Sequence, residues 1–182
     1  MANADTRDTN ATWGWGMLIA LLVVTAAARL LPHPPNLTPV IALALFCGAA
    51  LPQRLVATAA LLTLMFLTDL LLGLHKGMPV LYAALALICV MGSGLQLRSP
   101  ASAIAGRGLL AASLFFLLTN LSVWAFSGMY AHTWAGLTQC FVLAIPFFGN
   151  TLLGTAIYGA LLFGLGRQLP QTALRGVAPV TA

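Results

Sequence analysis

Charged residues are what this sequence has least of. Only 6% of its 182 residues are charged, three of them acidic, whereas 60% are hydrophobic. A water-soluble domain of this size does not need so large an apolar share to fill one core. We therefore expect an all-α integral membrane protein, because helices satisfy their own backbone polar groups in lipid.

Motifs for several kinds of chemistry are also missing. The chain has no Gly-x-Ser-x-Gly, no His-Glu-x-x-His, no phosphate-binding Gly-Lys-Ser/Thr loop and no paired carboxylates, so an ATPase, a zinc protease or a triad hydrolase has no support. Its three cysteines, Cys47, Cys89 and Cys140, lie inside apolar runs without CxxC spacing. We expect buried thiols and neither a disulfide framework nor a metal site or cofactor.

The apolar runs divide the chain into six predicted membrane spans within one domain, residues 1–182. A hydrocarbon core about 30 Å thick needs roughly 20 helical residues. The predicted spans are Trp15–Leu31, Thr38–Leu51, Leu55–Leu74, Pro79–Leu95, Gly108–Ser127 and Gly136–Leu165. The bundle thus covers residues 15–166, with cytoplasmic tails at 1–14 and 167–182.

Two of these spans have unusual lengths. Four prolines between Pro32 and Pro39 forbid regular helix, so the second span starts late and would rise only about 21 Å. This span either crosses a thinned region of the bilayer, extends through Arg54, or enters the bilayer and returns without crossing it. The sixth would rise about 45 Å if straight, and Pro146 followed by Gly149 predicts a kink in it.

The basic residues indicate topology rather than nucleic-acid binding, because each of the eight lies near the end of an apolar run. If the N-terminus is inside, only Arg29 and Lys76 lie outside and the other six basic residues are cytoplasmic. A second span that failed to cross would weaken this excess of cytoplasmic basic residues. Both termini are therefore predicted to be cytoplasmic. A cleaved signal peptide is the alternative for the first helix, but Asp5 and Asp8 outweigh Arg7 before it.

Polar residues gather in the outer half of the predicted bundle. Asp69 is the only acidic residue outside the N-terminal tail, and a carboxylate near lipid must be paired, protonated or exposed to water. Arg29 lies at a similar depth, and a structural ion pair and a direct ligand contact both remain open for Asp69. The candidate ligand-binding residues are His33, Asn36, Asp69, Tyr82, Asn120, Trp124 and Asn150.

The proline-rich segment from Leu31 to Pro39 could hold His33 and Asn36 over a cavity, and Asn36 or Thr38 could cap the next helix. A plain turn is the alternative. The three histidines have no metal-ligand spacing, which favours interfacial hydrogen bonding. Trp124 is also typical of an aromatic belt at the headgroups. The Ala44-x-x-x-Gly48 and Ala156-x-x-x-Ala160 patterns predict close helix approach, within the bundle or against a partner.

Four strings carry a family resemblance: RLLPHPPNLTPVIA from Arg29, LTDL from Leu67, LTNLSVW from Leu118 and IPFFGNTLLG from Ile145. They resemble a family of small bacterial membrane proteins of unknown function. In architecture that family is similar to the substrate-binding S components of energy-coupling factor transporters. The resemblance implies six helices, both termini inside, an outward-facing ligand pocket, and work with a transmembrane coupling protein and ATPase subunits.

We therefore expect a binding component for uptake of a small nutrient, such as a vitamin, a precursor or a metal complex, in the cell's inner membrane. It would not itself be an enzyme, and its partners would be the bilayer, a small-molecule ligand and a coupling module, with no nucleic acid. Two alternatives stay open. One is an accessory or assembly protein whose polar cluster ties helices together. The other is an intramembrane enzyme that uses Asp69 and a histidine as acid and base.

Overall fold

The structure is a computed structural model that describes residues 16, 19–51 and 54–168, and this part of the chain is all-helical. The helices are the N-terminal helix Ile19–Leu30, α2 Val40–Ala50, α3 Arg54–Leu72, α4 Met78–Gly92, α5 Ala101–Phe126 and α6 Trp134–Gly166. Three of them, α3, α5 and α6, are long and apolar enough to cross a membrane. The predicted tail 1–14, and the predicted tail 167–182 beyond residue 168, lie outside the described residues.

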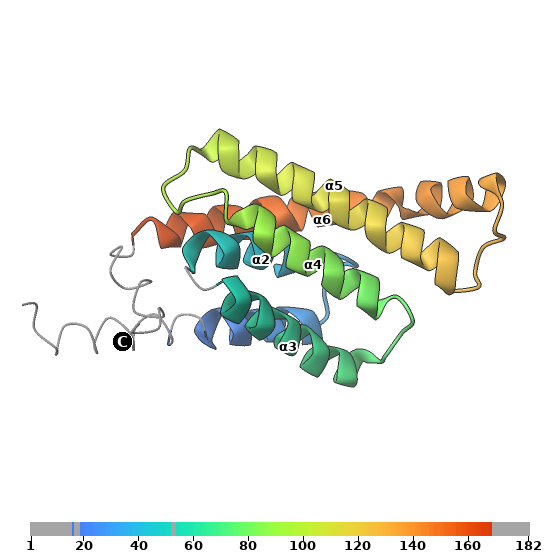
Figure 1. The fold of residues 1–182 in the computed structure, drawn as a ribbon, viewed down its shortest axis with the longest axis horizontal. Helices are drawn as coiled ribbons and strands as arrows, with labels where there is room; N and C mark the ends of the chain where they lie inside the picture. The colour runs from blue at the N-terminus through green and yellow to red at the C-terminus, as the bar shows by residue number, and fades with distance from the viewer. Residues whose placement is uncertain (1–15, 17–18, 52–53, 169–182) are drawn as a thin grey trace, which may run out of the picture.

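Consecutive helices run in opposite directions between two ends of the bundle (Figure 1). The loops 31–39, 73–77 and 127–133 lie toward one end, which we name the histidine end because they contain His33, His75 and His132. The turn 93–100 and the last residues of α6 lie at the other. We name that one the arginine end, after Arg98, Arg107 and Arg167.

The short helix α2 is the centre of the bundle. Every one of its 11 residues except Ala49 is buried, and it packs most extensively against α4 and α6. It rises only about 16 Å, well short of the roughly 30 Å hydrocarbon core. Because the other helices surround it, α2 does not have to meet lipid along its length.

Two glycines set the distance between α2 and α4. A Cβ atom at Gly48 would fall 1.9 Å from the carbonyl oxygen of Cys89, and one at Gly92 would fall 2.2 Å from that of Leu45. The two backbones are therefore in direct contact, which only glycine permits at these positions. The small-residue pattern that ends at Gly48 thus serves packing inside the bundle.

One helix start differs widely from the prediction. Helix α5 begins at Ala101, seven residues before the expected Gly108. Arg107 can lie inside the helix because its guanidinium donates to the Met91 carbonyl at 2.8 Å. Helix α6 is one element of 33 residues with Pro146 inside it, and the kink expected at this proline stays a prediction. Proline has no backbone N–H, and the helix tolerates the loss of this one hydrogen-bond donor.

Candidate functional site

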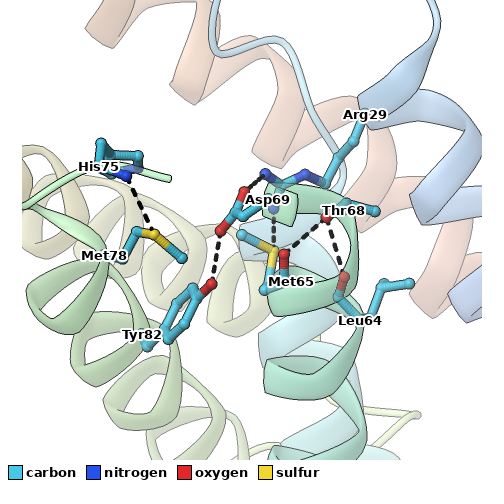
Figure 2. Close-up of polar contacts among 8 residues, drawn as sticks. All are labelled: Arg29, Leu64, Met65, Thr68, Asp69, His75, Met78 and Tyr82. Carbon is cyan, nitrogen blue, oxygen red and sulfur yellow. Dashed lines mark hydrogen bonds and ion pairs between the residues drawn. The ribbon is translucent and has the colours of Figure 1, made fainter. Parts of the chain in front are cut away.

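Asp69 lies in the last turn of α3 and is buried, with its side chain 5% exposed. One carboxylate oxygen, Oδ1, accepts a hydrogen bond from Arg29 Nη2 at 2.5 Å, and Oδ2 accepts one from the Tyr82 hydroxyl at 2.8 Å (Figure 2). A buried charge is tolerated when it is paired and its remaining lone pairs are satisfied. Both conditions are met for this carboxylate.

Arg29 is held from a second side. Its Nη1 lies against the sulfur of Met65, and its side chain is 11% exposed. The contacts come from three separate segments, because Arg29 belongs to the N-terminal helix, Asp69 to α3 and Tyr82 to α4 (Figure 2). The network therefore joins three helices and fixes the direction of the arginine.

A cavity of about 220 Å³ opens beside this network. Its polar lining consists of Arg29, His33, Asn36, Thr38 and Thr151. Its apolar lining consists of Val40, Ile41, Met65, Leu72, Leu81 and Phe115. Every helix in the described part of the chain contributes at least one of these residues, so the cavity lies where all of them meet.

The loop 31–39 forms one wall of the cavity in a fixed conformation. Asn36 has a φ of 64°, in the left-handed region that asparagine tolerates better than most residues. A side chain of α6 also holds the loop, because Asn150 Nδ2 donates to the Pro35 carbonyl at 2.9 Å. Gly154 adds to this because its missing side chain leaves room for the backbone of Thr38.

The structure brings together part of the predicted set. His33 and Asn36 line the cavity, whereas Asp69 and Tyr82 lie behind Arg29 and hold it. Asn150 acts on the loop through its contact with Pro35. Of the candidate residues, only His33 and Asn36 therefore line the cavity, whereas Asp69, Tyr82 and Asn150 contact Arg29 or the loop.

Asn120 and Trp124 do not reach this cavity. The Asn120 amide donates to the Phe116 carbonyl within its own helix at 2.8 Å. The Trp124 indole donates to the Ala131 carbonyl at 3.0 Å, and its ring centroid lies 5.3 Å from that of His132. The physical reason is length, because the α5–α6 hairpin extends beyond the other helices at the histidine end (Figure 1). Trp124 links α5 to the loop of that hairpin, whereas the Asn120 amide bonds within α5.

His33 and His132 each contact a residue close by in the chain. His33 Nδ1 lies 2.8 Å from the Leu31 carbonyl oxygen, and the His132 ring packs at a tilt of 60° against Trp124. Within the described residues, no three His, Cys, Asp or Glu side chains are grouped to hold a metal ion. Because Nδ1 of His33 donates to a carbonyl, its Nε2 is the acceptor in the neutral ring.

Comparison with known families identifies a relationship but no activity. Residues 9–175 match DUF6580, described as a family of unknown function. The chain belongs to the DUF6580 family. No curated protein and no solved structure matches it. In this DUF6580 protein the matched region includes every described helix and the whole cavity.

Sequence reasoning missed part of the site in this DUF6580 chain. Thr151 and Phe115 line the cavity from the middle of α6 and α5. Neither gives a signal, because a threonine and a phenylalanine within apolar runs are ordinary features of a membrane span. Leu72 and Leu81 are equally ordinary, and only the packing of the helices shows that they face the cavity.

Proposed function

We propose that the chain is a membrane-embedded binding component for a small nutrient, and that the 220 Å³ cavity is its binding site. The observation that carries this proposal is the convergence of every described helix on one cavity lined by both polar and apolar side chains. Helical bundles build their ligand sites in this way, from side chains on facing helices.

The proposed topology is six crossings with both termini in the cytoplasm. The alternating helix directions support it, including α2, which runs from the histidine end to the arginine end (Figure 1). Arg98, Arg107 and Arg167 lie at the arginine end, whereas Arg29 and Lys76 lie at the histidine end. The positive-inside rule then assigns the arginine end to the cytoplasm, and the cavity faces outward.

The cavity's chemistry suggests a small, neutral ligand. Its volume is about that of seven liquid waters and is below the roughly 300–1,000 Å³ of typical ligand pockets. Asp69 balances the charge of Arg29, so an anionic group is not required. An apolar body would lie on Val40 and Ile41, and His33 Nε2 and the Asn36 amide would offer hydrogen bonds at the rim.

Transport would require further proteins. The likeness to S components suggests a transmembrane coupling protein and ATPase subunits that use the energy of ATP, with this chain supplying recognition. The sequence contains no nucleotide-binding loop, which agrees with such a division of labour. The cytoplasmic membrane is the corresponding location.

Native mass spectrometry of the purified protein tests the proposal. We expect a small molecule to co-purify with the wild type and to be absent from Ile41→Trp, which fills the cavity. Leu87→Trp is the matched control, because Leu87 is 45% exposed on α4 and does not line the cavity. A wild-type protein without ligand, or equal retention by both variants, would contradict the binding role.

One observation favours a second candidate, a structural accessory protein. Both oxygens of Asp69 are used inside the protein, by Arg29 and Tyr82, so the polar network needs no ligand to be satisfied. This candidate predicts that nothing co-purifies and that variants of the network lose only stability. An intramembrane enzyme has less support, because the contacts of Asp69 are with Arg29 and Tyr82 rather than with a histidine.

A further inference from the structure

A larger groove, of about 530 Å³, runs between α5 and α6 toward the arginine end. Small residues create it, since Gly108 on α5 and Ala156, Gly159 and Ala160 on α6 leave room that longer side chains would fill. Ala156 and Ala160 are exposed, so this small-residue pattern does not pack against another helix of the described bundle. The groove is apolar along its length and ends at Arg167.

The length of the groove corresponds to one leaflet of a bilayer. Along α6 it extends from Leu152 to Arg167, a rise of about 22 Å. Along α5 it extends from Ala101 to Leu109, about 12 Å. Half of a hydrocarbon core is about 15 Å. An acyl chain that entered the groove at Arg167 would therefore lie in contact with protein over most of its length.

The charge at the mouth of the groove is positive. Arg167 is exposed and uses Nη2 to donate to the Ser99 carbonyl at 2.7 Å, which leaves most of its five N–H donors for other acceptors. Arg98, in the same turn as Ser99, is exposed as well. Among the described residues the one carboxylate is Asp69, near the opposite end, so no acidic side chain of that part neutralises these arginines.

We propose that this groove binds one acyl chain of an anionic phospholipid, whose phosphate contacts Arg167 and Arg98. Arginine forms bidentate hydrogen bonds with phosphate, and basic sites between membrane helices on the cytoplasmic side are suited to anionic headgroups. The inference rests on the membrane orientation proposed above and is independent of any ligand in the 220 Å³ cavity. A helix of a partner protein is the competing occupant, but it would leave the two arginines without an anion.

The test compares two lipids with identical acyl chains, phosphatidylglycerol and phosphatidylcholine, titrated onto the purified full chain. We expect phosphatidylglycerol to raise the thermal unfolding temperature in a saturable way. If each of the two arginines contributes about fivefold, phosphatidylglycerol should bind roughly 25-fold more tightly than phosphatidylcholine. Equal stabilisation by the two lipids would overturn the proposal without requiring any variant.

Two substitutions locate the binding site. Ala160→Leu fills the groove and should abolish the saturable stabilisation, whereas Ala83→Leu makes the same change on an exposed position of α4 and should preserve it. Arg167→Gln should reduce the preference for phosphatidylglycerol about fivefold. Arg167→Lys should keep most of it, because the charge remains even if the contact with Ser99 is altered.

Lys76→Gln is the control for non-specific attraction, since Lys76 lies at the histidine end. If Lys76→Gln weakens the preference as much as Arg167→Gln does, the attraction is diffuse and the proposal fails. Unchanged stabilisation of Ala160→Leu would also overturn it, since the lipid would then bind elsewhere. Native mass spectrometry of Ala160→Leu keeps the two proposals separate, because a nutrient in the other cavity should remain bound to this variant.

Discussion

At the scale of single residues, the buried ion pair between Arg29 and Asp69 should be sensitive to the loss of either partner. Asp69 is the only described carboxylate, and it balances an arginine whose side chain is 11% exposed. Asp69→Asn leaves that charge uncompensated and should lower the free energy of unfolding by about 3–5 kcal/mol. The double variant Arg29→Gln/Asp69→Asn should recover a large part of this loss. Chemical unfolding in detergent measures both, and a stable Asp69→Asn would contradict the account.

Tyr82→Phe tests the contribution of the one uncharged side chain that binds the Asp69 carboxylate. Removing the hydroxyl deletes one hydrogen bond to a buried carboxylate, which typically contributes about 1.5–3 kcal/mol. We expect a loss in this range, smaller than that of Asp69→Asn, with the Arg29 pair intact. If Tyr82→Phe loses bound ligand while its stability is unchanged, Tyr82 contacts the ligand directly instead of supporting the carboxylate.

Asn36 allows its backbone role and its side-chain role to be separated. Its φ of 64° costs an ordinary residue about 1–2 kcal/mol, and glycine has no such cost. Asn36→Gly should therefore keep wild-type stability, whereas Asn36→Ala should unfold more easily. If the amide binds ligand, both variants should show weaker ligand retention by native mass spectrometry. Retention by Asn36→Gly alone would assign Asn36 a purely conformational role.

At the scale of elements, the contact between α2 and α4 should be the most sensitive packing site. Gly48→Ala and Gly92→Ala place a methyl group about 2 Å from a backbone carbonyl, so a whole helix must move. We expect a loss of at least 1–3 kcal/mol for each, as for other overpacked cores. Gly106→Ala is the control, because nothing lies within 4 Å of a Cβ there and alanine favours helix. Thermal unfolding distinguishes them, and similar results for the three variants would refute the packing argument.

The elements also show what sequence patterns can predict. The prolines before Val40 predicted a late and short second helix, and the structure confirms it, because proline's effect on the backbone is local. The start of α5 was predicted wrongly because an arginine at position 107 was read as the end of an apolar run. In the folded chain that side chain donates to Met91, sixteen residues away, which the sequence does not encode locally.

At the scale of the whole molecule, the polar residues of the site were easier to predict than its shape. Arg29 and Asp69 were paired correctly because charges at one depth in lipid must find each other. Asn120 and Trp124 were included on the same reasoning, yet each binds a nearby backbone carbonyl. Depth along a helix can be counted from the sequence. The direction in which a residue faces, and the overhang of the α5–α6 hairpin, follow only from the packing of all the helices.

The central claim is a ligand cavity that opens to the outside of a six-crossing bundle, and thiol labelling in intact cells tests it most directly. The native cysteines Cys47, Cys89 and Cys140 are buried, which keeps the background low. In intact cells, a membrane-impermeant reagent should label Thr38→Cys, which lies in the cavity lining, and also His132→Cys. The same reagent should label Ser102→Cys only after the cells are permeabilised. Labelling of position 38 from the cytoplasm alone, or of positions 38 and 102 from the same side, would contradict the account.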